Sequence, residues 1–228
     1  MRSGVRLRVV YLPKHNLADS ELLSQMLSGI RAADLVSATA SGPYATFLPL
    51  IYDPTSAPAG ALLGHVARRN DHWRLETIGE SMVIVHGPDA YVSPGWYASK
   101  REHGRVVPTW NYTIAHVYGE LLVHDDPVWL EDVVRRLTER HERDRSPGWS
   151  VDDAPRDYVD GQLQAIVGLE LRISRVQAKA KLGQGRSAAD LDGVIAGLND
   201  HDALIHAGDA RAPAELAELT ATRARRDA

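Results

Sequence analysis

The chain has 228 residues, of which 44% are hydrophobic and 25% charged, the balance of an ordinary globular protein that folds in water. It has no cysteine, which excludes disulfides, thiolate metal sites and cysteine nucleophiles, and its net charge of −4 gives no broad attraction to nucleic acid. No apolar run approaches the roughly 20 residues of a membrane span, and the first residues do not form a secretion signal. We therefore expect a cytoplasmic protein that has no membrane partner.

The first third of the chain predicts one helix followed by several short strands. Apolar residues at helical spacing, preceded by an aspartate N-cap, predict a helix over residues 19–31. Segments rich in β-branched and aromatic residues then predict two strands around Ser41–Gly42, and the composition of residues 53–60 indicates a loop. Residues 64–70 are typical of a strand that runs into a polar turn, and residues 81–85 of another short strand.

The middle of the chain predicts a strand and two helices. Residues 113–123 alternate well enough to form a strand. The pair Asp126–Pro127 then begins a helix, because aspartate is a good N-cap and proline suits the first turn. On the solvent side of this helix, Glu131–Arg135 and Glu139–Arg143 are predicted to form favourable ion pairs one turn apart. A second, shorter helix is expected near residues 155–164.

The last part of the chain contains the clearest strand pattern. Residues 167–173 alternate between apolar and polar side chains, which predicts a half-buried strand with one wet face. It leads into a glycine-rich basic turn at residues 179–186, after which Ser187 caps a helix. We expect one domain over residues 1–205 and a helical or frayed tail over residues 206–228.

Strands do not alternate with helices along the chain, so the predicted fold is mostly β, an antiparallel barrel with flanking helices. The usual short motifs for phosphate-binding loops, zinc proteases and serine hydrolases are absent. Gly183 and Gly185 supply two glycines of a dinucleotide-binding fingerprint without the third, and the ten histidines show no ligand spacing. The sequence thus predicts neither a catalytic residue nor a metal site.

Aromatic residues are concentrated in the segment 83–121. Six of the chain's fourteen Phe, Trp and Tyr residues lie between Tyr91 and Tyr118. Polar residues are interleaved with them: Ser93, Lys100, Arg105, Thr109, Asn111 and His116. Flat aromatic faces beside fixed hydrogen-bonding groups suit a planar heteroaromatic ligand with a charged tail. The same residues could equally be the core of a strand pair, and composition alone leaves both interpretations open.

Three segments place basic and hydrogen-bonding groups on turns. They are residues 65–70, which include Arg68 and Arg69, residues 93–100, and residues 179–186 before a helix start. Guanidinium and ammonium groups beside free backbone N–H groups suit a phosphate. Each segment alone is more typical of a solvated loop. Together with the aromatic segment they favour a mononucleotide-like ligand.

Long stretches of the sequence resemble the PaiB-type negative transcriptional regulators. The stretches that carry the resemblance are YLPKH at 11–15, LLGHVARRN at 62–70, GPDAYVSPGWYASK at 87–100, VPTWNYTIAHVYG at 107–119, LTERHE at 137–142, AIVGLELRI at 165–173 and KLGQGR at 181–186. They cover about the first 200 residues in the family's order. The chain departs from the family's KLSQNR-like turn, because Gly183 and Gly185 stand at its Ser and Asn positions.

The resemblance implies an FMN-binding split β-barrel, antiparallel and Greek-key-like, that forms a homodimer with FMN in grooves between the subunits. By position, Arg68 is the first candidate for the phosphate and Arg69 the second, and Lys181, Gln184 and Arg186 are expected to reach in from the partner subunit. The implied FMN-binding residues are His65, Val66, Ala67, Arg68, Arg69, Ser93, Trp96, Tyr97, Lys100, Thr109, Trp110, Asn111, Lys181, Gln184 and Arg186.

Three functions are compatible with this resemblance. The first is a repressor that responds to flavin or another ligand. The second is an FMN-dependent oxidoreductase that uses NAD(P)H, in which the flavin supplies the hydride chemistry. The third is a dimeric binding module whose flavin groove is empty. A DNA partner is possible, with Arg101, Arg105 and the basic tail as candidate contacts, but neither a helix-turn-helix nor the net charge supports it.

Overall fold

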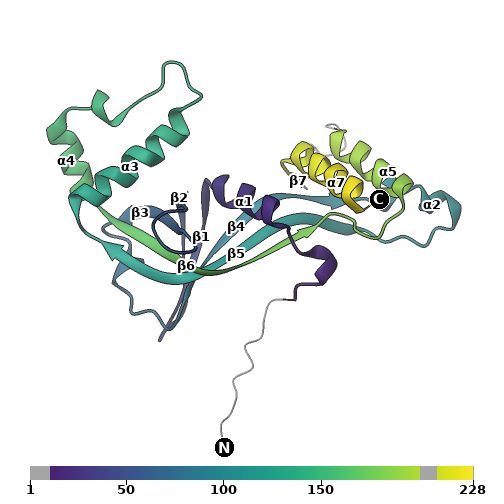
Figure 1. Cartoon of the computed structure of the whole chain (residues 1–228), viewed down its shortest axis with the longest axis horizontal. Helices are drawn as coiled ribbons and strands as arrows, with labels where there is room; N and C mark the ends of the chain where they lie inside the picture. The colour runs from purple at the N-terminus through teal and green to yellow at the C-terminus, as the bar shows by residue number, and fades with distance from the viewer. Residues whose placement is uncertain (1–10, 201–209, 228) are drawn as a thin grey trace, which may run out of the picture. The chain divides into compact units, whose positions relative to one another are not determined.

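The computed structural model describes residues 11–200 and 210–227, which form two compact units (Figure 1). Within the described residues, unit 1 comprises residues 11–23, 86–115, 177–200 and 210–227, and unit 2 comprises residues 24–85 and 116–176. Three long strands contribute residues to both units: β4 (Ser81–Val92), β5 (Thr109–His124) and β6 (Ile166–Lys181). The expected domain boundary between residues 205 and 206 lies outside the described residues.

Unit 2 is a closed antiparallel barrel. Its first three strands are β1 (Ala32–Thr39), β2 (Gly42–Asp53) and β3 (Ala61–Ala67). The strand order is β1-β2-β3-β6-β5-β4, and a pairing of β1 with β4 closes the ring. The pairs β1–β2, β2–β3, β3–β6 and β1–β4 are antiparallel. The predicted barrel of antiparallel strands is therefore confirmed, whereas the homodimer stays a prediction.

Two strands are longer than the sequence predicted, and one predicted hairpin is present. The hairpin expected around Ser41–Gly42 is confirmed, and Gly42 occupies a positive φ of 111° at the turn. The strand expected over residues 81–85 continues to Val92, past a glycine and a proline that sequence patterns treat as breakers. The strand expected over residues 167–173 continues to Lys181. The sheet pairs β6 with β5, and this pairing does not require side chains that alternate between apolar and polar.

Helix α3 (Pro127–Glu142) covers part of the barrel, and Asp126 caps it by accepting a hydrogen bond from the Trp129 backbone N–H at 2.8 Å. Trp129 lies directly over Gly168, where an added Cβ atom would sit 2.1 Å from the indole ring. His124 stacks on Trp129 with ring centroids 4.0 Å apart, and its Nε2 lies 2.7 Å from Oε2 of Glu170. The prediction that residues 167–173 have one solvent-exposed face is therefore wrong at Gly168 and Glu170. Both are buried beneath α3 and the residues around it.

Two apolar clusters hold α3 and α4 (Arg156–Gln164) in place. One joins α3 to the barrel through Ile51, Ala61, Leu63, Val133 and Leu137, and the other consists of Leu130, Val151, Val159 and Leu163. The ion pair predicted between Glu131 and Arg135 is present at 2.8 Å. The one predicted between Glu139 and Arg143 is not formed, and Arg143 has no carboxylate partner among the described residues.

Unit 1 contains residues 11–23, the remaining parts of β4, β5 and β6, the short strand β7 (Ala210–Arg211), and helices that cover one face of these strands. The covering helices are α5 (Ala188–Asn199), capped by Ser187 as predicted, and α7 (Pro213–Asp227), which lie side by side (Figure 1). Their shared core contains Ala90, Val92, Tyr97, Ala180, Leu182, Val194, Leu198, Leu216 and Ala217. In residues 11–200 and 210–227 no helix is both long enough and apolar enough to cross a membrane.

Candidate functional site: an aromatic and basic face of unit 1

The strands of unit 1 have a second face that the two helices do not cover. Successive residues of a strand point to opposite faces, so the neighbours of buried Ala90 and Ala180 belong to this second face. They are Tyr91 on β4, Trp110 and Tyr112 on β5, and Lys179 and Lys181 on β6, and we call this set the outer face. All five side chains are half-buried or exposed, and Trp110 keeps 39% of its surface accessible. The outer face is therefore partly open to a ligand, although Tyr11 of unit 1 also lies beside it, with its ring centroid 5.8 Å from the Lys179 ammonium.

Trp110 is the best-fixed ring of the outer face. Its Nε1–H donates to Oδ1 of Asp89 at 3.0 Å, which sets the orientation of the indole. The ring of Tyr91 lies beside it, with centroids 6.2 Å apart and planes tilted by 59°. A hydrogen-bonded indole at a partly exposed position is an apolar platform that does not need to reorganise when a flat ligand binds.

Two lysines supply positive charge to the same face. The Lys181 ammonium donates to the backbone oxygen of Trp110 at 3.0 Å and also to the Thr109 hydroxyl. The Lys179 ammonium lies 5.2 Å from the ring centroid of Tyr112, which is within the range of a cation–π interaction. The outer face thus combines flat rings with two ammonium groups, an arrangement that suits a planar anionic ligand.

The predicted segment 93–100 lies elsewhere in unit 1. Ser93 caps the 3₁₀ turn η3 (Pro94–Trp96) by accepting from Gly95 N–H at 3.1 Å, and Lys100 is exposed on the short helix α2 (Ser99–Glu102). Tyr97 is only 3% exposed and belongs to the core under α5 and α7. Trp96 packs against α5, so both rings serve packing in this structure, and their contact with a ligand stays a prediction.

Asn111 lies on β5 between two residues of the outer face but points the other way. It is 2% exposed, and its Oδ1 has no hydrogen-bond partner among the described residues. Of the predicted residues in unit 1, the structure therefore brings Thr109, Trp110 and Lys181 together and leaves Asn111 on the helix-covered side.

The glycine-rich turn after β6 is closed by its own residues. The Gln184 side chain accepts from Leu182 N–H at 2.9 Å and donates to the Ala180 carbonyl at 2.6 Å, which uses both ends of the amide. Gly183 and Gly185 have φ values of 86° and 82°, a conformation that serine adopts only with strain. The two glycines that depart from the family pattern thus suit the backbone that this turn adopts.

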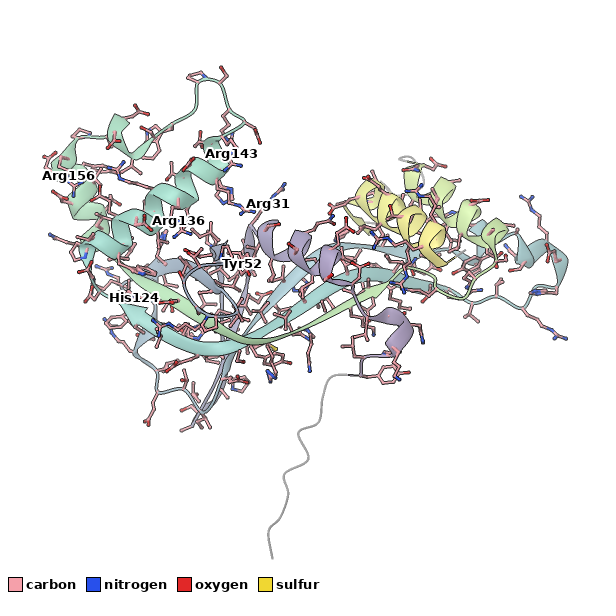
Figure 2. The ribbon with its side chains drawn as sticks, in the orientation of Figure 1. Arg31, Tyr52, His124, Arg136, Arg143 and Arg156 are labelled. Carbon is pink, nitrogen blue, oxygen red and sulfur yellow. The ribbon has the colours of Figure 1, made fainter. Side chains whose placement is uncertain are left out.

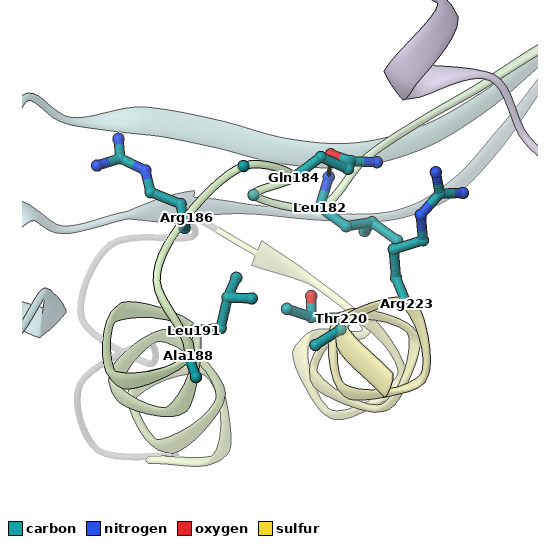
Figure 3. Close-up of a pocket in the computed structure, with 10 residues that line it drawn as sticks. Leu182, Gln184, Arg186, Ala188, Leu191, Thr220 and Arg223 are labelled. Carbon is teal, nitrogen blue, oxygen red and sulfur yellow. Dashed lines mark hydrogen bonds between the residues drawn. The ribbon is translucent and has the colours of Figure 1, made fainter. Parts of the chain in front are cut away.

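A cavity of about 240 Å³ lies between this turn, α5 and α7 (Figure 3). Leu191 and Thr220 point into it from the two helices, and the Arg186 and Arg223 side chains lie on opposite sides of it. The Arg186 guanidinium is stacked over the ring of Tyr97, 4.2 Å from the centroid. The ligand contact predicted for Arg186 therefore competes with a stacking role inside unit 1.

The predicted phosphate turn, residues 65–69, belongs to unit 2. Arg68 Nε donates to the Gln164 carbonyl at 2.7 Å, and Nη2 donates to the Ile166 carbonyl at 3.0 Å. Both terminal nitrogens also contact the carboxylate of Asp125, and this hydrogen bonding raises the pKa of Arg68 further above its ordinary value. Arg68 thus clamps the end of β3 to β5 and β6. Of its predicted neighbours, Val66 is buried, whereas Ala67 and Arg69 are exposed.

His65 is the remaining member of that turn. Its Nδ1 is buried and has no hydrogen-bond partner in residues 11–200 and 210–227, and burial lowers the pKa of the ring. The imidazole is therefore neutral at physiological pH and is not a positive contact for a phosphate.

We expect Arg68→Lys to lower the midpoint of thermal unfolding, because an ammonium cannot reproduce the planar fork that reaches Asp125 and two carbonyls. Arg69→Lys, at an exposed position in the same turn, is the matched control and should leave the midpoint unchanged. Differential scanning calorimetry checks both. Equal midpoints for the two variants would show that the clamp contributes nothing to stability, and the phosphate role would then be the better account of Arg68.

Unit 2 also contains a serine–histidine pair, which sequence patterns could not locate. Ser37 Oγ lies 2.8 Å from His72 Nε2 and 2.6 Å from Ser81 Oγ, and His72 Nδ1 lies 2.9 Å from Thr46 Oγ1. Ser37 and His72 are each only 1% exposed. A nucleophile needs access to a substrate, so this network is structural.

Three residues of the outer face, Tyr91, Tyr112 and Lys179, lay within the aromatic and basic segments singled out from the sequence but were not among the implied FMN-binding residues. A usable signal existed, because Tyr112 is two residues from Trp110 and Lys179 is two residues from Lys181. Residues at this spacing share one face of a strand. At Lys179 the shared face was not recognised, because the strand was expected to end near residue 173 and Lys179 was assigned to the basic turn, whereas β6 continues to Lys181.

The chain is similar to a known protein family and to several known proteins. Residues 10–175 match the family described as "putative FMN-binding domain". The Bacillus subtilis protein named "protease synthase and sporulation protein PAI 2" is 29% identical over 195 residues, 85% of this chain and 91% of that protein. An uncharacterized protein of Emericella nidulans is 30% identical over 222 residues, 82% of this chain and 88% of that protein. Lys179, Lys181 and both covering helices lie beyond the matched range.

Two solved structures share the fold. The flavocytochrome Anf3 of Azotobacter vinelandii superposes with a TM-score of 0.51 at 13% identity, covering 76% of this chain and 73% of its own. An FAD- and heme-binding protein of Mycobacterium smegmatis gives a TM-score of 0.51 at 17% identity, covering 81% and 80%. At such low identity these likenesses establish the split-barrel fold alone.

Proposed function

The chain belongs to the family of FMN-binding split-barrel domains, and on that premise we propose that it is a dimeric flavoprotein of the PaiB type that represses transcription in response to flavin or another ligand. FMN is the cofactor of the family, and when bound it supplies redox chemistry of its own. The protein's part is to bind the flavin, orient it and limit the access of water.

The outer face is the observation that carries the flavin proposal. A planar isoalloxazine ring would lie against Trp110 and Tyr112, and the phosphate would meet the ammonium groups of Lys179 and Lys181. The fit is chemical, because FMN has a flat ring system at one end and an anionic phosphate at the other. Thr109 holds Lys181 in place and is a positioning residue in this proposal.

The regulatory and dimeric parts of the proposal rest on the resemblance to PaiB-type regulators and on the similarity to PAI 2. A second copy of the chain is the partner that would enclose the half-exposed rings of the outer face. For a DNA contact, Arg101 and Arg105 are exposed, whereas Arg226 of the basic tail forms an ion pair with Glu21 at 2.6 Å. Arg101 and Arg105 are therefore the better candidates.

We expect the purified protein to show the two absorbance bands of an oxidised flavin and to bind FMN more tightly than riboflavin, which lacks the phosphate. The double variant Lys179→Met/Lys181→Met should weaken FMN binding by roughly tenfold or more, because two charge-assisted contacts are lost. Lys14→Met, at an exposed position of unit 1, is the control and should bind as the wild type does. Fluorescence quenching of the flavin measures all of these affinities.

Unchanged FMN affinity in the double variant would show that the outer face is not the flavin site.

The same purified protein distinguishes the other functions that the sequence left open. Reduction of the bound flavin by NADH or NADPH faster than that of free FMN would favour an oxidoreductase. A protein that neither carries nor takes up flavin would favour an empty binding module. Analytical ultracentrifugation gives the oligomeric state.

A further inference from the structure

Three arginines of unit 2 gather near the C-terminal end of α3. Arg140 lies in the last turn of α3, Arg143 follows its last residue, and Arg31 lies just before β1. Figure 2 labels Arg31 and Arg143 near the end of α3, and the charges of both act on Arg140. Arg140 donates through Nη2 to the carbonyl of Ser28 at 2.5 Å, which holds its guanidinium on this side of the helix. We call these residues the arginine cluster.

The arginine cluster differs from the other arginines around α3, because each of those is neutralised. Arg135 pairs with Glu131 and Asp152, Arg136 with Asp53 and Asp132, Arg145 with Glu142, and Arg156 with Glu131 and Asp160. In the part of the chain that the structure describes, no carboxylate forms an ion pair with Arg31, Arg140 or Arg143.

Glu139 is the acidic residue placed to neutralise Arg143. It lies four residues earlier on the same helix, a spacing that normally favours an ion pair. No such pair forms, and both side chains are exposed. Arg143 therefore forms no ion pair among the described residues, although a carboxylate lies one turn away on the same helix.

The charges that act most strongly on Arg140 are those of the other two members. Its partial burial, followed by the positive charges of Arg143 and Arg31, lowers the pKa of Arg140 below its ordinary value. Like charges repel, so keeping three guanidinium groups together without an anion is unfavourable. A structure that keeps them so is prepared for an anion that arrives from outside the chain.

We propose that Arg31, Arg140 and Arg143 form a phosphate-binding site. Guanidinium groups present N–H donors in a planar fork that matches the oxygens of a phosphate. Arg31 and Arg143 are exposed and can close on a ligand, whereas Arg140 is anchored by the Ser28 carbonyl and provides a fixed contact. The arginine cluster belongs to unit 2 and shares no residue with the outer face of unit 1, so the two proposals are tested by different variants.

Inorganic pyrophosphate is the probe for the test, titrated by isothermal calorimetry at low salt. The wild type should bind it, and Arg31→Gln/Arg143→Gln should weaken binding by roughly tenfold or more, because two charged contacts are lost. Arg140 is left intact because its bond to Ser28 supports the fold. The matched control is Arg145→Gln/Arg156→Gln, which removes the same charge from paired, exposed arginines and should bind as the wild type does.

Two further measurements, of DNA binding and of FMN binding, identify the kind of molecule that carries the phosphate. If duplex DNA binds in a salt-dependent way, is displaced by pyrophosphate and is lost in the Arg31/Arg143 variant, the phosphates are those of a nucleic acid backbone. If the variant loses FMN as well, the phosphate is that of the flavin. If pyrophosphate binds and neither of these holds, the ligand is a free phosphate compound. No pyrophosphate binding by the wild type, or equal weakening in the control variant, would overturn the proposal.

Discussion

Leu216→Ala is expected to lower the free energy of unfolding by about 2–5 kcal/mol, the usual cost of removing a buried leucine side chain and leaving a cavity. Leu216 is 0% exposed and lies on α7, in the core that α5 and the strands of unit 1 share. That core also receives Ala217 from the same helix. Since each kcal/mol lowers the melting temperature of a chain this size by roughly 2–4 °C, calorimetry detects the loss easily.

Glu218→Ala is the control for this experiment. The residue is exposed on the same helix, and both glutamate and alanine are good helix formers, so the change should alter stability by less than about 0.5 kcal/mol. A Leu216→Ala protein as stable as the wild type would mean that α7 does not pack on α5 in solution. The last helix would then be a free tail rather than part of unit 1.

This prediction concerns a part of the chain that sequence patterns described poorly. Residues 206–228 are rich in Ala, Glu and Arg, a composition typical of a helix but one with few apolar side chains to indicate what it packs against. The burial of Leu216 and Thr220 depends on a partner helix, and a pairing between helices cannot be read from the periodicity of one of them. Helices α3 and α5 were easier to predict, because Asp126 and Ser187 mark their beginnings.

At the candidate site, too, sequence patterns identified residue types but not the contacts that each side chain makes. Chemical type selected Trp110 and Lys181, which the structure brings together through a hydrogen bond from Lys181 to the Trp110 carbonyl, and their contact with a ligand stays a prediction. It could not separate Trp110 from Trp96 or Tyr97, because the direction of a side chain depends on the strand or turn that carries it. Arg68 shows a further limit, since a basic residue in a turn looks the same whether its partner is a phosphate or the chain's own Asp125.

Gly193→Ala is expected to destabilise the protein although alanine favours helices. Within α5 the substitution alone would add about 1 kcal/mol of stability, since glycine is a weak helix former. A Cβ atom at this position, however, would lie 2.0 Å from the backbone oxygen of Trp96. Overpacking of this kind costs about 1–3 kcal/mol and occasionally more, and a backbone atom in contact puts the cost at the upper end. We expect a net loss of about 2 kcal/mol.

The segment that carries Trp96 cannot move away cheaply. Asp190, in the first turn of α5, accepts hydrogen bonds from the Ser99 N–H and hydroxyl, both at 2.9 Å, and so ties this segment to the same helix. Gly161→Ala on α4 is the matched control, because nothing lies within 4 Å of an added Cβ there, and it should stabilise the protein by about 0.5–1 kcal/mol. Opposite signs for the two substitutions, measured by chemical denaturation, would establish the close contact of α5 with η3. A stabilising Gly193→Ala would mean that the two are further apart in solution, and Trp96 would then be free to meet a ligand.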